Sequence, residues 1–105
     1  MEDFRIIYRI LKYLCDSMDF EEFNAEDFKA ETFKTNDNRF NALLIQMQKS
    51  GYIEGLIIRR YSRDSLKPIQ PLNPRITLKG LEYLNENSMM KKAADIAKGI
   101  TEIII

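Results

Sequence analysis

The hydrophobic pattern of the chain changes its period at Gly51, and this change limits the folds open to it. Before Gly51, apolar residues recur every three or four positions, which is the spacing of amphipathic helices. After Gly51, residues 52–60 are rich in β-branched and aromatic side chains, as strands are. A helical spacing returns at Leu78. The sequence therefore predicts helices first, then a β segment, and then helices again.

Two helices are expected in the first third of the chain. The first carries an apolar stripe and has Asp3 placed to cap its start. The stripe consists of Phe4, Ile7, Tyr8, Leu11, Leu14, Cys15 and Met18. A short second helix is expected over residues 25–31, because Asn24 can cap it and Phe23 and Phe28 occupy the two positions of a hydrophobic staple.

A third helix is expected to begin after a cap at Thr35 or Asn36 and to end at Gly51. Its apolar stripe is Phe40, Leu43, Leu44 and Met47. Since only a short polar turn separates it from the second helix, the pair is typical of a helix-turn-helix unit. At about 100° per residue, the outward face consists of Asn38, Ala42, Ile45 and Lys49, flanked by Arg39, Asn41 and Gln46.

The β segment is expected to contain one strand over residues 52–60 and a short returning strand at residues 75–77. Residues 61–72 between them are expected to form a loop. Three prolines, Pro68, Pro71 and Pro74, favour extended backbone there and forbid a central strand.

The sequence of the final third of the chain predicts two helices. Thr77 can cap a helix over residues 78–86, and Gly80 within it indicates close approach to a neighbouring backbone. Asn87 and Ser88 then suggest a break followed by a separate last helix. Three helices followed by a two-stranded β wing form the winged-helix arrangement, an α+β and mostly α fold. We expect residues 1–86 to form this domain and residues 87–105 to form a C-terminal helix and tail.

Four segments resemble the YjcQ-type family of small bacterial and phage-associated winged-helix proteins. They are residues 3–8 (DFRIIY), 51–55 (GYIEG), 73–84 (NPRITLKGLEYL) and 87–93 (NSMMKKA). The resemblance covers nearly the whole chain and follows the same order of segments. It implies the winged-helix fold, and it assigns no activity, ligand or DNA site to any residue.

The side chains that enzymes use most often are scarce. The chain has no histidine and a single cysteine, Cys15, so imidazole-based triads and thiolate zinc sites are excluded. Its four glycines are too scattered for a phosphate loop. The one dense group of carboxylates, residues 16–22, lacks the spacing of a calcium loop. We expect a protein that is not an enzyme and that uses no cofactor or metal.

The expected location is the cytoplasm. The first residues lack the basic start and apolar core of a secretory signal. No apolar run approaches the roughly 18 residues that a membrane span needs. A lone cysteine also fits a reducing compartment.

Positive charge gathers in the middle of the chain. Residues 34–80 carry nine basic and three acidic side chains, although the whole chain carries sixteen of each. Such asymmetry is typical of proteins with an anionic partner, and a solvated wing of mixed charges would look similar.

In a first hypothesis, the third helix enters the major groove of double-stranded DNA. The expected phosphate contacts are Lys34, Arg59, Arg60, Arg63 and Lys67. Base edges would be contacted by Asn38, Arg39, Asn41, Ala42, Ile45 and Gln46, with Lys49 completing the outward face. In a second hypothesis, the domain is a non-catalytic protein-interaction module, because Lys49 is the one basic residue of the central outward stripe and Ile45 lies among its apolar members.

The last expected helix is amphipathic. One side carries Met89, Met90, Ala93, Ile96, Ala97 and Ile100. Such a stripe must lie on its own core or pair with a second copy, because an apolar face left in water promotes association. We expect a homodimer held by residues 88–105, and packing against the parent core is the alternative.

Overall fold

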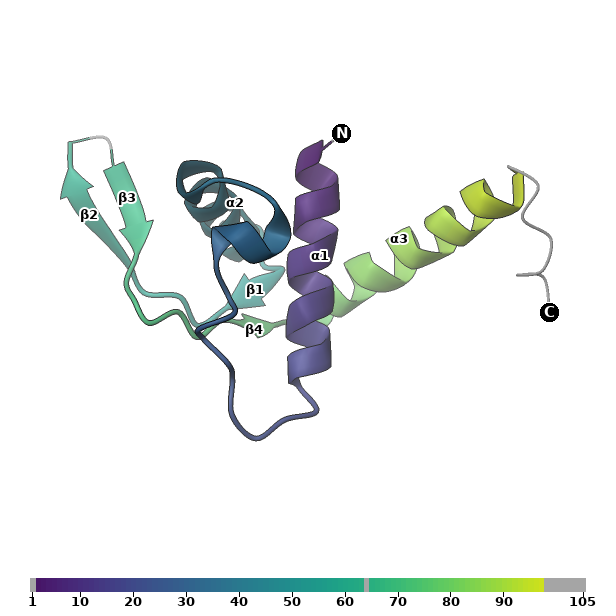
Figure 1. The fold of residues 1–105 in the computed structure, drawn as a ribbon, viewed down its shortest axis with the longest axis horizontal. Coiled ribbons are helices and arrows are strands. Elements are labelled where there is room, and N and C mark those ends of the chain that lie inside the picture. Colours follow the sequence, from purple (N-terminus) through teal and green to yellow (C-terminus); the bar gives the residue numbers. More distant parts are fainter. Residues whose placement is uncertain (1, 64, 98–105) are drawn as a thin grey trace.

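The structure, a computed structural model, describes residues 2–63 and 65–97 (Figure 1). It is an α+β fold with two small antiparallel sheets. The helices are α1 (Glu2–Ser17), the 3-10 helix η1 (Ala30–Phe33), α2 (Asp37–Lys49) and α3 (Leu78–Ala97). The strands are β1 (Ile53–Glu54), β2 (Ile58–Ser62), β3 (Ser65–Pro68) and β4 (Arg75–Ile76).

Helix α1 buries a different stripe from the one expected. Ile6 and Ile10 are almost fully buried, together with the predicted Leu11 and Leu14. The predicted Phe4 and Met18 are instead exposed. Apolar residues occur at more than one angular position on α1, so their spacing alone could not fix the buried face. Asp3 also lies inside the helix, which begins at Glu2, and its side chain binds Arg39 rather than capping the helix start.

The expected helix over residues 25–31 does not form. Residues 25–27 make a single turn, and the helix that follows is η1. Phe23 and Phe28 do meet, with ring centroids 5.4 Å apart, but as members of an aromatic cluster rather than as a helix staple. The cluster consists of Tyr13, Phe23, Phe28, Phe33 and Phe40. Burial of these rings against one another determines the local path of the chain.

Helix α2 follows its sequence signals closely. The side chain of Asn36 accepts a hydrogen bond from the Arg39 amide at 2.9 Å, which is the geometry of an N-cap. Gly51 lies just beyond the helix end, as expected. Its φ of 87° is the left-handed conformation that glycine favours at such a position. Phe40, Leu44 and Met47 are buried, so the predicted inward face is confirmed.

The β segment is a hairpin interrupted on both of its arms. Strand β1 pairs with β4, and β2 pairs with β3. The single strand expected over residues 52–60 is divided at Gly55, whose φ is 95° and whose absent Cβ would lie 2.9 Å from the carbonyl oxygen of Asn73. The expected loop over residues 61–72 was wrong in part, because β3 forms there. Pro68 is accommodated because it is the last residue of a strand in a two-stranded sheet.

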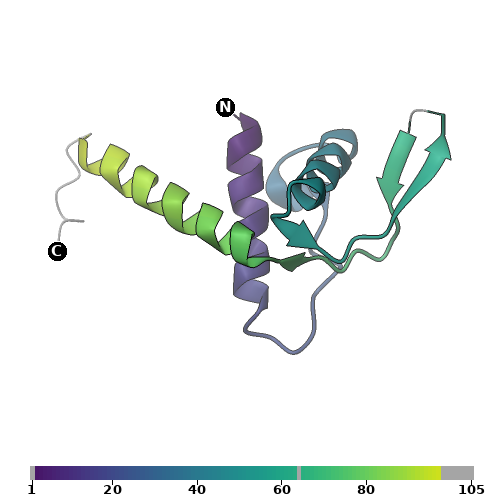
Figure 2. The ribbon, with the colours of Figure 1, turned by 180° about the vertical axis from the view of Figure 1, so that it is seen from behind.

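Helix α3 is continuous through the predicted break. Thr77 caps it, since its hydroxyl oxygen accepts a hydrogen bond from the Gly80 amide at 3.1 Å. The side-chain amide of Asn87 donates to the Tyr83 carbonyl at 2.8 Å, so this residue stays within the helix and does not end it. Leu84 is buried near the start of α3, whereas the far half of the helix leaves the body on the side opposite the β2–β3 hairpin (Figures 1 and 2).

Candidate nucleic-acid interface

The outward face predicted for α2 is largely open. Asn38, Ala42 and Lys49 are exposed, and Ile45 is half-buried. On its flanks Gln46 is exposed and Asn41 is half-buried. This face therefore offers short polar side chains and a small apolar centre with one cation at the C-terminal end of the helix.

Two basic residues stand at the start of α2. Lys34 adopts a left-handed backbone conformation, with φ 58°, where η1 ends. Together with Thr35, Asn36 and Arg39 it lines a polar hollow of about 430 Å³. The Arg39 guanidinium forms an ion pair with Asp3 of α1, so the arginine already has an intramolecular partner. Positive charge at this point adds to the partial charge of the helix N-terminus.

The β2–β3 hairpin divides its basic residues between its two faces. Arg59 stands directly opposite Lys67, and Arg60 stands opposite Leu66. Since directly opposed residues of an antiparallel pair share a face, Arg59 and Lys67 place two like charges side by side. Arg63, just beyond β2, is also exposed.

A polar joint holds the hairpin beside α2. The Gln48 side chain accepts a hydrogen bond from the Leu56 amide at 2.8 Å and donates one to the Leu56 carbonyl at 3.0 Å. Strand β3 also contacts α2. In Figure 1, α2 lies between the hairpin and α1. The predicted base contacts thus lie on α2, and the predicted phosphate contacts lie on the neighbouring hairpin, apart from Lys34 at the end of η1.

The start of α3 is tied to the same region. The Lys79 ammonium donates to the Ser50 carbonyl at 2.9 Å and lies 5.1 Å from the centre of the Tyr52 ring. Tyr52 also packs against Tyr83, with ring centroids 5.3 Å apart. Burial, followed by the nearby Tyr52, raises the pKa of Tyr83. Lys79 is therefore engaged in structure, although the sequence counts it within the basic block.

The residues predicted for dimerisation lie on the far half of α3. The backbone of Met89, Met90, Ala93, Ile96 and Ala97 is helical, and Ile100 lies outside the described residues. Figure 2 shows this half of α3 away from the body of the protein. Both the homodimer and the alternative, packing on the parent core, stay predictions.

Sequence reasoning missed two residues that shape this region. No sequence signal indicates the role of Gln48. Its partner Leu56 lies outside the helix and comes within hydrogen-bond distance only in the folded chain. Leu66 is 46% exposed on the hairpin. The sequence predicted a loop there, so it could not indicate to which face of a strand this side chain belongs.

Among residues 2–63 and 65–97, no group of three or more cysteine and carboxylate side chains is arranged to hold a metal ion. No helix in the same residues is both long and apolar enough to cross a membrane.

Comparison with known proteins identifies a family. The family model described as YjcQ protein matches residues 8–103. Neither the curated proteins nor the solved structures contain a match to the chain.

Proposed function

The chain belongs to the YjcQ protein family, and we propose that it is a winged-helix DNA-binding protein that acts as a transcriptional regulator in a bacterium or phage. In this proposal α2 is the recognition helix, and the β2–β3 hairpin is the wing. The order of helices followed by an extended hairpin and a further helix supports this assignment. No catalytic step is part of the proposal.

The observation that carries the proposal is the placement of a basic hairpin beside the open face of α2. Gln48 joins these two elements through both polar groups of Leu56. A recognition helix reads base edges only when neighbouring groups hold phosphates on either side of the groove. In this proposal, Lys34 before the start of α2 and Arg59 on the hairpin supply those contacts.

The chemistry of α2 suits base contacts better than phosphate contacts. Asn38 can form a bidentate pair with adenine, and Ala42 and Ile45 offer the apolar surface that a thymine methyl group requires. Because α2 itself carries few cations, affinity would come mainly from the hairpin. The Arg39–Asp3 ion pair would have to open, or hold Arg39 to one side, when DNA binds.

A protein partner is the second candidate function. Ile57 is 68% exposed and Leu66 is 46% exposed, so the hairpin offers apolar as well as basic surface. Half-buried Ile45 on α2 adds to this surface. Apolar side chains within a mixed surface are typical of protein interfaces.

We also propose that the protein is a homodimer joined through the far half of α3. Residues 88–97 carry an apolar stripe in sequence, and Figure 2 shows this half of α3 extending from the body. Two-fold pairing of such helices would place two copies of α2 at the two half-sites of a DNA operator.

The test of DNA binding is a salt titration of the full chain against generic duplex DNA. Phosphate contacts release counterions, so the logarithm of the binding constant should fall linearly with the logarithm of the salt concentration. A single-stranded DNA of equal length serves as the comparison. Absence of duplex binding at low salt would reject DNA as the partner and favour the protein-interaction function.

A further inference from the structure

An open cleft lies between the end of α1, the connector after it and the segment that leads into β4. Its volume is about 700 Å³, within the range of roughly 300–1,000 Å³ typical of small-molecule sites. The lining is mostly apolar and includes Met18, Phe20, Phe23, Pro71 and Pro74. None of the lining residues belongs to the candidate nucleic-acid interface.

Two large apolar side chains of the lining are open to water. Met18 is 63% exposed and Phe20 is 72% exposed. Leu14 and Leu72, deeper in the lining, are buried in the core. The cleft therefore has a closed apolar floor and an uncovered apolar mouth. An apolar ligand seated there would remove both exposed side chains from water, which favours binding.

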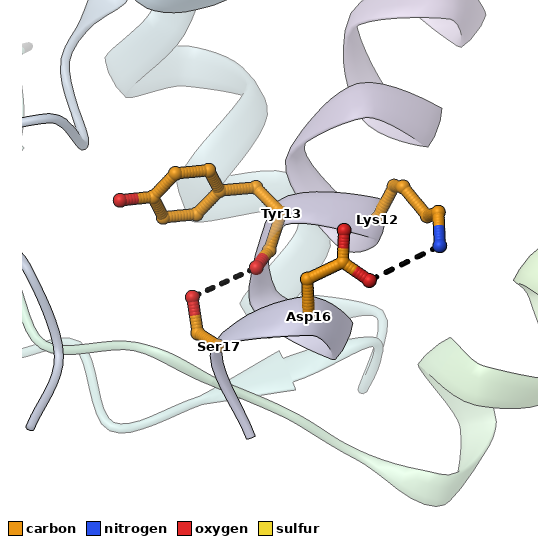
Figure 3. Close-up of polar contacts among 4 residues, drawn as sticks. All are labelled: Lys12, Tyr13, Asp16 and Ser17. Carbon is orange, nitrogen blue, oxygen red and sulfur yellow. Dashed lines mark hydrogen bonds and ion pairs between the residues drawn. The ribbon is translucent and has the colours of Figure 1, made fainter. Parts of the chain in front are cut away.

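The charged groups of the lining are chiefly carboxylates. Glu21 and Glu22 both line the cleft and are exposed, and neither forms an ion pair within the described residues. Asp16, on the preceding helix, differs because it binds the Lys12 ammonium at 3.1 Å (Figure 3). The two glutamates are thus the acids of the lining, and their charge is available to a ligand.

The remaining polar groups of the lining do not cancel this charge. The Ser17 hydroxyl donates to the Tyr13 carbonyl at 2.8 Å, so it is used within α1 (Figure 3). Arg75 is the single basic residue of the lining, and it stands directly opposite Glu54 in the β1–β4 pair. Opposite charges at such positions attract. No ion pair joins them within the described residues, so with Glu21 and Glu22 ionised the lining keeps a net charge of −1.

We propose that this cleft binds a small organic cation with an apolar body, such as an alkyl or arylalkyl ammonium ion. The apolar body covers Met18 and Phe20, and the ammonium group lies near Glu21 and Glu22.

The experiment is an NMR titration of the ¹⁵N-labelled full chain with n-octylammonium chloride, with sodium octanoate as the matched anion. The amides of residues 14–25, 72, 73, 75 and 76 should shift on addition of the cation. Octanoate should bind at least about fivefold more weakly, as expected when exposed carboxylates attract one ligand and repel the other. Shifts confined to other parts of the chain, no shifts at millimolar cation, or equal affinities would each overturn the proposal.

A pair of variants separates charge from apolar contact. The double variant Glu21→Gln, Glu22→Gln should lower affinity for n-octylammonium about fivefold and leave that for 1-octanol unchanged. The control Glu26→Gln, Glu31→Gln removes two exposed acids outside the cleft and should change neither affinity. Phe20→Ala should weaken both ligands. Retention of full n-octylammonium affinity by the first double variant would contradict the proposal.

Discussion

The side-chain amide of Gln48 forms two hydrogen bonds with the backbone of Leu56, at 2.8 and 3.0 Å. In a β ladder, those two bonds would come from a partner strand. Leu56 lies between β1 and β2, where the strand pairing is interrupted. A side chain at the end of α2 therefore replaces a strand partner, and it links the helix directly to the hairpin.

Replacement of Gln48 by alanine should destabilise the protein. The change leaves the N–H and carbonyl groups of buried Leu56 without their partners. The expected loss in the free energy of unfolding is about 1–3 kcal/mol, measured by urea denaturation. Gln46→Ala is the matched control, because Gln46 is an exposed residue of the same helix. Equal stability of the two variants would show that the paired bonds contribute nothing.

Replacement of Gly80 by alanine should also destabilise the protein, although alanine is the better helix former by about 1 kcal/mol. A Cβ at this position would collide with the Tyr52 carbonyl oxygen and with the Ile76 side chain. We expect a net loss of roughly 1–3 kcal/mol from the collision, measured by thermal and urea unfolding. Glu82→Ala, at an exposed site of α3, should be close to neutral. A stabilised Gly80→Ala protein would refute the close approach.

Removal of two hairpin charges should weaken DNA binding regardless of sequence. The double variant Arg59→Ala, Arg60→Ala should bind all duplexes less tightly and should flatten the salt dependence by roughly 0.9 log unit per lost phosphate contact. The control Arg5→Ala, Arg9→Ala removes the same charge from exposed sites on α1. If both double variants lose affinity equally, the hairpin has no special part in binding.

Asn38→Ala should alter which duplex is preferred. Loss of a bidentate base contact costs about 1–3 kcal/mol at one base position and leaves the other positions unchanged. Selection from a randomised duplex library measures this directly. Asn85→Ala, which changes an exposed asparagine of α3, provides the comparison. An unchanged preference after Asn38→Ala would mean that this side chain is only solvated surface.

Truncation after Asn87 should convert a dimer into a folded monomer. The shortened chain keeps Leu81 and buried Leu84, so the first half of α3 can still pack on the core. Sedimentation of both chains at micromolar concentration measures the change, and circular dichroism verifies folding of the shorter one. A monomeric full chain contradicts the dimer, and an unfolded short chain would show that residues 88–105 support the core.

Local sequence signals predicted three helix ends correctly, but they failed at Asp3 and at Asn87 and did not predict tertiary packing. Asn36, Gly51 and Thr77 act through their own backbone neighbours, so their roles could be recognised from sequence. Gly80 is similar, because an early helix glycine points to a close contact. The burial of Ile6 and Ile10 depends on which side of α1 the other elements cover, and no spacing within α1 determines this.

The candidate site shows the same division. Its outward α2 residues follow from helical geometry and are largely exposed as expected. The Asp3–Arg39 ion pair joins residues 36 positions apart, and the apolar cleft is assembled from the end of α1, the connector and the segment before β4. Contacts of this kind arise only when the chain folds, so the sequence pattern carries no direct sign of them.

Because α3 is one continuous helix, the direction in which its far half presents a side chain depends on the number of residues that precede it in the helix. Its 20 residues correspond to about 30 Å of helix, with about 1.5 Å and 100° added by each residue. Insertion of two residues beyond Leu84 would turn the apolar stripe to nearly the opposite side, whereas about seven residues, or two turns, would almost restore its direction. A partner that binds this half of α3 must therefore match the rotational phase of the helix as well as its composition.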